Sequence, residues 1–477
     1  MSCRELLPSI VAPRAGRPSG PASPTRARGL PALLLVAALV SPLPTRGDAA
    51  PARPRQAAST VAAADAAVAA WVEAERIPGA VLLVSRDDRI VLGKAYGWAQ
   101  LYEYRDGQYG AAAAGTPRPT AVRRLAQPRP MTAETVFDLA SLTKVMATTF
   151  AAMLLVETGE LDLDAPVHTY LPDFRGAGKE RITPRHLLTH RAGLAAWQPV
   201  YYRAQSARQA YEYIRDLPLA WGVGEERHYS DLGFMVLGLL VERVAGEPLG
   251  AFLDERLWGP LGLASIGFQS APAGAPPRPG ALDDPGGPRP PATVAPAPVI
   301  GPFAATSHGN PYEHRMVHDA TFGYRYDGDS DAWAGWRRYT LAGEVNDGNA
   351  FHAFGGAAGH AGLFATAADL RVLLQLLLNR GEYGGRRYLS PEVVETFLAP
   401  AGDGQALGWQ APANLPAGSF AHPGFTGTWV LGVPAEGLAV VLLTNRQNLG
   451  VDERGYYPDL VELQQAVAAI ARPLPER

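Results

Sequence analysis

Short apolar runs near both ends of the chain predict strands, and longer runs with helical spacing fill the region between them. Residues 80–85 and 90–96 are rich in β-branched side chains and are joined by Arg86-Asp87-Asp88-Arg89, a pattern typical of a β-hairpin. Residues 428–433 and 438–445 flank Pro434-Ala435-Glu436-Gly437 and predict a second hairpin. This order predicts an α+β fold, in which one antiparallel sheet is built from both chain ends, flanked by helices and interrupted by an inserted helical region.

Apolar residues share a helical face in five segments: 62–75, 142–158, 233–245, 248–256 and 367–379. They predict three parts for the mature chain. These are the N-terminal part of the α/β domain at 60–140, a mainly helical region at 141–390 and the C-terminal part of the α/β domain at 391–477.

Three stretches fit none of these elements. Residues 108–130, with four prolines and a Gly-Ala-Ala-Ala-Ala-Gly tract, and residues 271–298, with ten prolines, are expected to be aperiodic surface insertions. Residues 312–338 either line a substrate cleft or pack over the core as a loop. Their aromatic side chains are Tyr312, Phe322, Tyr324, Tyr326, Trp333 and Trp336.

Residues 1–50 predict a secretory signal peptide and leader. Arg26 and Arg28 precede an apolar run at 30–40 that is too short to span a bilayer, and Gly47-Asp48-Ala49 suits cleavage. A short membrane anchor is the alternative. Cys3 lies before the apolar run, so the mature chain would carry no thiol, which suits a secreted or periplasmic protein without a membrane span after signal removal.

The composition excludes several classes of protein. Of the 477 residues, 47% are apolar and 19% charged, which indicates a soluble globular chain, and the net charge of −3 offers no basic field for nucleic acid. The single cysteine excludes a disulfide scaffold and cysteine metal sites. Lysine is rare: of the 43 basic residues, only Lys94, Lys144 and Lys179 are lysines, and the others are arginines.

The sequence Ser141-Leu142-Thr143-Lys144 opens the most apolar of the predicted helices. Ser141 lies at its N-terminus, where free N–H groups and the helix dipole favour a developing oxyanion. A lysine in so apolar a helix is expected to lose its proton more easily and to accept the proton of Ser141. Arginine cannot do this, so a rare lysine here favours catalysis over an N-cap serine beside a lysine that reaches solvent.

A second segment, His228-Tyr229-Ser230-Asp231, precedes the helix predicted from residue 233. Tyr229 can present its phenol to a cleft, where a nearby lysine would lower its pKa enough for general-base catalysis. Ser230 and Asp231 also suit plain helix capping.

A third segment runs from His422 through Pro423, Gly424 and Phe425 into the late hairpin. Gly424 lets the backbone approach a ligand closely, and the N–H of Phe425 offers a second oxyanion donor opposite the N–H of Ser141. A plain turn before a strand is the alternative.

In this order the three segments resemble the motifs of the serine β-lactamase-related hydrolases of the class C type, which include penicillin-binding carboxypeptidases and bacterial esterases. Leu187-Leu188-Thr189-His190 with Gly193, and residues 359–364, are similar too, so the resemblance covers about residues 62–445. It implies catalytic roles for Ser141, Lys144 and Tyr229, and oxyanion or substrate contacts from Phe425, His422, Gly424 and Asp231.

The third motif departs from the family pattern. His422 stands where many relatives have lysine, and Pro423 stands where they have threonine, so a hydroxyl and an N–H are lost. Both changes weaken the site for the free carboxylate of a β-lactam or a D-alanyl terminus. Efficient β-lactamase activity is therefore the least expected of the family's chemistries.

Other signals indicate no metal or cofactor. His186 and His190 have the i, i+4 spacing of a helical zinc pair, but no glutamate lies between them and no further ligand is near, so contacts to the backbone at a helix end are expected. His360, between two glycines, is expected to order a turn. The sequence contains no Gly-x-Ser-x-Gly elbow, Walker-type loop or dinucleotide-binding loop.

The sequence therefore predicts an exported, cofactor-free serine hydrolase that forms an acyl-enzyme. Its expected substrates are small esters or D-amino-acid cell-wall peptides, as for an esterase or a D-alanyl carboxypeptidase-like enzyme. Whether Lys144 or Tyr229 takes the first proton stays open. The alternatives are a penicillin-binding or sensing protein of the same scaffold without efficient turnover, and an acyl transferase.

Overall fold

The structure, a computed structural model, describes residues 53–105, 122–269 and 299–471. The predicted leader, the Pro-rich insertion at 271–298 and residues 108–121 lie outside the described residues. Within the described ranges, no helix combines the length and the apolar character that crossing a membrane requires.

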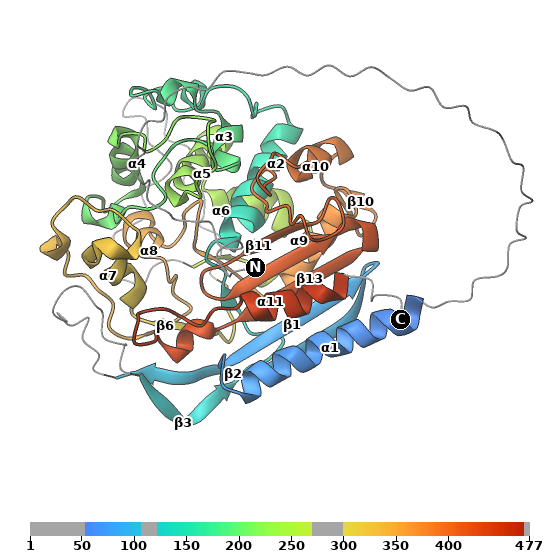
Figure 1. Cartoon of the computed structure of the whole chain (residues 1–477). Coiled ribbons are helices and arrows are strands. Elements are labelled where there is room, and N and C mark those ends of the chain that lie inside the picture. The colour runs from blue at the N-terminus through green and yellow to red at the C-terminus, as the bar shows by residue number, and fades with distance from the viewer. Residues whose placement is uncertain (1–52, 106–121, 270–298, 472–477) are drawn as a thin grey trace, which may run out of the picture.

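A six-stranded antiparallel sheet joins the two ends of the chain, as predicted (Figure 1). Its strand order is β11-β12-β13-β1-β2-β3, so the central pair β1 and β13 comes from opposite ends of the sequence. The strands are β1 (Gly79–Arg86), β2 (Arg89–Tyr104), β3 (Val122–Pro130), β11 (Phe420–Pro423), β12 (Thr428–Val433) and β13 (Leu438–Thr444).

Both predicted hairpins are confirmed, and their turns have clear local causes. Asp87 and Asp88 link β1 to β2 with φ of +48° and +62°, the left-handed values that a two-residue hairpin turn needs and that aspartate tolerates. Gly437 takes φ of +55° between β12 and β13.

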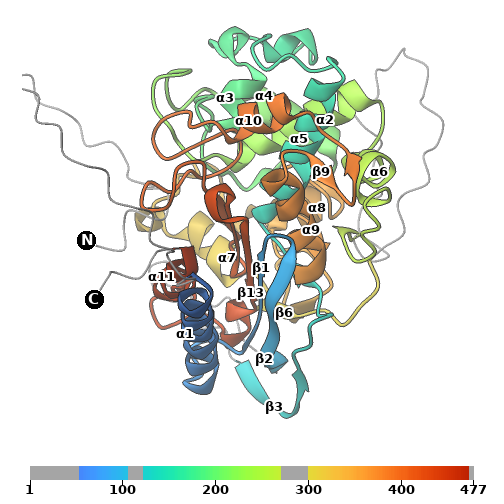
Figure 2. The same cartoon turned by 90° about the vertical axis from the view of Figure 1, so that its right-hand side faces the viewer.

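Helices cover both faces of this sheet (Figure 2). Leu82 and Val84 belong to a core with α1 (Arg53–Glu73) and α11 (Val461–Ala468), whereas Val81 and Leu83, one residue out of step, belong to the main core with α9 (Ala367–Leu378). Because both faces are covered, β1 is a continuous apolar run rather than an alternating one.

The inserted region packs its helices beyond one end of the sheet, at the top of Figure 1. Three short strands, β4 (Phe137–Asp138), β8 (Leu363–Ala365) and β5 (Gly267–Phe268), form a second sheet at its base. Two small pairs complete the strands: β6 (Ala305–His308) with β7 (Thr340–Ala342), and β9 (Glu382–Tyr383) with β10 (Arg386–Arg387). The remaining α-helices are α2 (Thr149–Glu157), α3 (Pro184–Leu188), α4 (Ala207–Asp216), α5 (Asp231–Ala245), α6 (Leu249–Leu253), α7 (Pro311–His318), α8 (Gly348–Phe354) and α10 (Pro391–Leu398).

One expectation about these elements is wrong. Residues 122–130 are not part of an aperiodic insertion but form the edge strand β3, which tolerates Pro128 and Pro130 because an edge strand leaves half of its N–H groups unpaired. The helix predicted at 142–158 is confirmed, and it includes a π-helical turn, η2 (Lys144–Thr148), before α2. The helix predicted at 248–256 is confirmed too, and it changes from α6 to a π-helical turn at Asp254–Trp258.

Candidate active site

Ser141 lies on a tight turn between β4 and η2, at the edge of a cavity. The preceding residue, Ala140, has φ of +46°, which a residue with a side chain rarely adopts. The Asp138 carboxylate stabilises this turn, since one oxygen accepts the N–H of Ala140 at 2.8 Å and the other accepts the N–H of Asn346 at 2.6 Å. The surroundings therefore fix the position of the predicted nucleophile.

Asp138 makes the stability of the protein depend on pH. Burial raises its pKa from an ordinary 3.8 to about 6, against the opposing effect of the two N–H donors. The folded state thus holds the proton more tightly than the unfolded chain, and the stability gained below pH 4 is lost as the pH rises through 6. We expect Asp138→Asn to remove this dependence. The difference in free energy of unfolding, variant minus wild type, should then become more positive by up to about 3 kcal/mol between pH 4 and pH 7.5. Urea unfolding of both proteins at the two pH values measures the change, and parallel pH dependences would contradict it.

Lys144 is fully buried at the first position of η2, one turn after Ser141. Its Nζ lies 2.9 Å from Ser141 Oγ, 2.7 Å from an Asp231 carboxylate oxygen and 3.3 Å from the His360 carbonyl oxygen. Nζ thus donates hydrogen bonds to Ser141 and to the His360 carbonyl, while its contact with Asp231 is an ion pair. The spacing in Ser-x-x-Lys therefore does bring the hydroxyl and the amine together.

The expectation that burial would loosen the Lys144 proton is wrong. Burial does lower the pKa of Lys144, but attraction to Asp231 and Tyr229 and hydrogen bonds with both outweigh it, so the pKa lies above its ordinary value. In the free protein Lys144 is a paired ammonium group.

Tyr229 lies on the loop before α5, with its ring over the Lys144 amine at 4.9 Å from the ring centroid. Its side chain hydrogen-bonds with Lys144 and Ser141. Lys144 lowers the pKa of the phenol, as predicted, but burial and the negative charge of Asp231 act against it, and the net pKa is raised rather than lowered. Tyr229 is therefore a neutral phenol in contact with both partners.

The two residues after Tyr229, Ser230 and Asp231, have different roles. Ser230 is the N-cap of α5, and its Oγ accepts the N–H of Gly233 at 3.0 Å, which confirms capping for this residue. Asp231 was expected among the substrate-binding residues. It is the ion-pair partner of Lys144, although it also lines the cavity.

The third segment forms the opposite wall, where His422, Gly424 and Phe425 line the cavity with Ser141. Burial, reinforced by the charge of Lys144, lowers the pKa of His422 to about 3, so the ring is neutral, with Nδ1 donating to the Pro423 carbonyl at 2.8 Å. A Cβ at Gly424 would lie 2.0 Å from Thr428 Oγ1 and 2.4 Å from the carbonyl oxygen of Leu139. This glycine therefore allows close packing against the Ser141 turn, in addition to lining the cavity.

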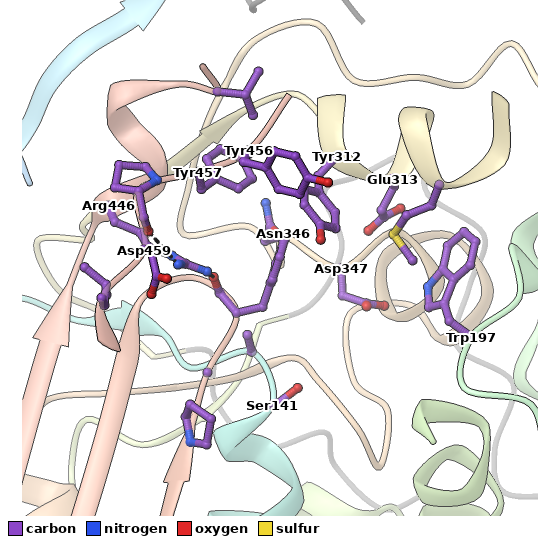
Figure 3. Close-up of a pocket in the computed structure, with 18 of the residues that line it drawn as sticks. Ser141, Trp197, Tyr312, Glu313, Asn346, Asp347, Arg446, Tyr456, Tyr457 and Asp459 are labelled. Carbon is purple, nitrogen blue, oxygen red and sulfur yellow. Dashed lines mark hydrogen bonds between the residues drawn. The ribbon is translucent and has the colours of Figure 1, made fainter. Parts of the chain in front are cut away.

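The cavity has a volume of about 1010 Å³ (Figure 3). Arg446 and Asp459 lie on one side in this view and Glu313, Asp347 and Trp197 on the other, with Ser141 below. Tyr312, Phe322 and Tyr324 of the aromatic segment line it, whereas Tyr326, Trp333 and Trp336 pack on Tyr201 and Tyr202. Both interpretations of that segment therefore hold, each for part of it.

Several polar groups at the site gave no signal in the sequence. His360 lies on the expected turn, but its Nε2 also contacts an Asp347 oxygen at 3.0 Å, while its carbonyl accepts from Lys144. Burial and the charge of Asp347 raise the pKa of Glu313 to about 8, whereas His360 holds the pKa of Asp347 below its ordinary value. Glu313 is thus a protonated acid beside an ionised one. Glu313 comes from α7, and Asp347 and His360 come from loops, all far from Ser141 in the sequence, so only the fold brings them to the cavity.

The two histidines considered for zinc make separate local contacts. His186 completes a capping box with Thr183 at the start of α3, and Nδ1 of His190 accepts the N–H of Ser230 at 3.1 Å. In the part of the chain that the structure describes, no three His, Cys, Asp or Glu side chains are grouped to hold a metal ion.

Comparison with known proteins agrees with this geometry. The model of the Beta-lactamase family matches residues 64–464. The chain is 31% identical over 413 residues to "N-acetylmuramyl-L-alanine amidase" of Bacillus subtilis (strain 168), with 81% of each chain covered. It is 29% identical over 414 residues to "Putative D-alanyl-D-alanine carboxypeptidase" of Escherichia coli (strain K12), covering 81% of this chain and 83% of the relative.

Among solved structures, "A class C beta-lactamase" aligns with a TM-score of 0.59 at 17% identity, covering 89% of this chain and 99% of its own. At that identity the alignment supports the fold alone. The family match over most of the sequence, with a relative above 30% identity, shows that the chain belongs to the Beta-lactamase family and is a serine hydrolase.

Proposed function

We propose that Ser141 is the nucleophile of an acyl hydrolase that works through a covalent acyl-enzyme. The observation that carries this proposal is the contact of 2.9 Å between Ser141 Oγ and the buried Lys144 Nζ at the edge of the cavity. A serine hydroxyl is a weak nucleophile until a neighbouring base takes its proton, and the buried amine is placed to receive it.

The hydrogen bond between the two groups can reverse without moving either one. As an ammonium, Lys144 donates to Ser141 Oγ and the His360 carbonyl and forms an ion pair with Asp231. As a neutral amine it keeps the last two contacts, and its lone pair receives the hydrogen bond of Ser141. Tyr229 hydrogen-bonds with both side chains and is the second candidate for the base, so the first proton passes to one of these two groups.

The proposed reaction has two stages, acylation of Ser141 and hydrolysis of the acyl-enzyme. Ser141 Oγ forms a bond to the substrate carbonyl carbon, and its proton passes to the base. The negative oxygen of the tetrahedral intermediate receives the N–H groups of Ser141 and Phe425. The base returns the proton to the leaving amine or alcohol as its bond to the carbonyl carbon breaks. Water then attacks the acyl-enzyme by the same proton path, releasing the acid and free Ser141.

The substrate class that we propose is a D-amino-acid peptide of the cell wall, with small esters as simpler substrates. A cavity of about 1010 Å³ exceeds the needs of a short ester. The names of the Bacillus subtilis and Escherichia coli relatives also refer to cell-wall peptides. Export, predicted from the leader, would place the enzyme with this substrate.

A substrate panel combined with covalent labelling tests the proposal. We expect release of D-alanine from a D-Ala-D-Ala peptide and turnover of p-nitrophenyl acetate. A fluorescent penicillin should label the protein and be lost within minutes after unbound label is removed. Intact-mass spectra follow the adduct. Label that persists for hours, without turnover of either substrate, would instead indicate the penicillin-binding protein without efficient turnover.

A further inference from the structure

The loop that carries Phe425 has a glycine at each end, and residues outside the loop hold the Phe425 carbonyl. It runs from Gly424 to Gly427, whose φ of +110° only glycine adopts easily. Within the loop, Thr426 Oγ1 donates to the Asp138 carbonyl at 2.7 Å and the Gly424 N–H to the Thr428 carbonyl at 2.7 Å. The Gly427 N–H also donates to the Gly424 carbonyl at 3.0 Å and so holds the peptide group before Phe425, whereas no bond within the loop holds the carbonyl of Phe425 itself.

Arg446, two residues after the end of β13, holds the carbonyl of Phe425. Its Nη2 and Nε donate to the Phe425 carbonyl oxygen at 2.7 and 3.3 Å, and Gln447 Nε2 approaches the same oxygen at 3.4 Å. Its Nη1 donates to the Pro458 carbonyl at 2.7 Å, which ties the guanidinium to a second segment of the cavity wall.

The ring of Phe425 is held by the same neighbourhood. The Arg446 guanidinium carbon lies 5.7 Å from the ring centroid, and the rings of Tyr312 and Tyr457 pack on it at 4.9 and 5.8 Å. The Gly427 N–H holds the peptide group before Phe425 and Arg446 holds the one after it, so the two together set the backbone dihedrals of Phe425 and the direction of its N–H.

The charge of Arg446 is not neutralised by a salt bridge. Among the described residues its guanidinium makes no ion pair, and Asp459 attracts it only from a distance. Arg387 makes a similar clamp at the surface, where it donates to the carbonyls of Arg380 and Leu389 and its charge is paired with Glu382. A partly buried, unpaired cation in the cavity wall needs a further reason, because desolvating a charge is costly.

We propose that Arg446 is a positioning residue that, by holding the Phe425 carbonyl, aims the Phe425 N–H at the substrate oxygen that becomes negative during attack by Ser141. This inference rests on the proposed function, since it assumes that the Phe425 N–H serves the oxyanion. It adds a residue outside the three sequence motifs to the reaction, and it predicts an effect on the transition state rather than on substrate binding.

The test compares Arg446→Gln with Arg387→Gln, which removes a similar clamp far from the cavity. We expect Arg446→Gln to lower kcat for p-nitrophenyl acetate by about 10- to 100-fold with KM changed less than about threefold, and Arg387→Gln to leave both unchanged. Binding of a boronic acid, which forms a tetrahedral adduct on Ser141, should weaken in parallel with kcat. A merely structural role for Arg446 would not give this parallel loss.

Gln447→Leu provides a second route to the same carbonyl. In the wild-type protein this substitution should lower kcat by about threefold to tenfold. In the Arg446→Gln variant it should lower kcat by a smaller factor, because both side chains act through the Phe425 carbonyl. If Arg446→Gln does not fold, Gln447→Leu with the boronic acid carries the test.

Wild-type kcat in Arg446→Gln, or a rise in KM alone, would overturn the inference. Turnover retained by Ser141→Ala would instead overturn the proposed function, so the two failures are distinguishable.

Discussion

Replacing Ser141 with alanine is expected to abolish hydrolysis of both p-nitrophenyl acetate and a D-Ala-D-Ala peptide, with kcat/KM falling by about 10⁴-fold or more. The variant lacks the atom that we propose forms the acyl-enzyme, while Lys144 keeps its ion pair with Asp231 and its hydrogen bond to the His360 carbonyl. The fluorescent penicillin should no longer label the protein. Steady-state kinetics and intact-mass spectra measure both effects.

The matched control for this experiment is Ser419→Ala. Ser419 is buried, whereas Ser141 is half-buried, and the Ser419 Oγ donates to a single acceptor, the Pro416 carbonyl at 2.6 Å, away from the cavity. We expect both variants to stay folded, with circular dichroism spectra like that of wild type, and only Ser141→Ala to lose activity. Turnover that survives in Ser141→Ala would show that another group attacks the substrate.

The sheet could be predicted from sequence because its signals are local. The turn at Asp87 and Asp88 lies between two β-branched runs, and each hairpin is complete within about twenty residues. The edge strand β3 could not be predicted in this way. Arg123 and Arg124 give it no apolar face, and it is held by its pairing with β2, where Val122 lies opposite Tyr104 across residues that carry no strand pattern.

The candidate site also has residues that local sequence predicts and residues that it does not. Ser141 and Lys144 lie one helical turn apart, so their spacing alone predicts their contact. Asp347, His360 and Arg446 arrive from loops about 200 or more residues further along the chain, and no spacing in the sequence relates them to Ser141.

The protonation of Lys144 shows a second reason for error. Burial alone lowers the pKa of a lysine, but a nearby negative charge raises it, and the sequence does not show which charges lie near Lys144. Sequence motifs assigned Asp231 to the substrate, whereas the fold places its carboxylate 2.7 Å from Nζ. Attraction to this carboxylate helps to keep Lys144 an ammonium group, and under the proposed function its proton must leave before Ser141 can be activated.

This requirement leads to the second large effect, the loss of activity in Lys144→Arg. In wild type the raised pKa of Lys144 and the raised pKa of Tyr229 keep both protons in place at low pH, so kcat/KM should increase with pH until the coupled pair loses one of them. Arginine keeps the positive charge but stays protonated. We therefore expect kcat/KM to fall by about 10³-fold or more, measured with p-nitrophenyl acetate from pH 6 to 10.

The pH profile of the residual activity then identifies the base. If Lys144 takes the first proton, Lys144→Arg should lose the rise with pH, whereas a rise that remains would assign the first step to Tyr229.

Since removing one partner of a buried ion pair costs about 3 to 5 kcal/mol, Lys144→Met alone could lose activity by unfolding. The control is therefore Lys144→Met combined with Asp231→Asn, which removes both charges. It should be more stable to urea than Lys144→Met alone and equally inactive, and wild-type turnover in either this double variant or Lys144→Arg would exclude Lys144 from the reaction.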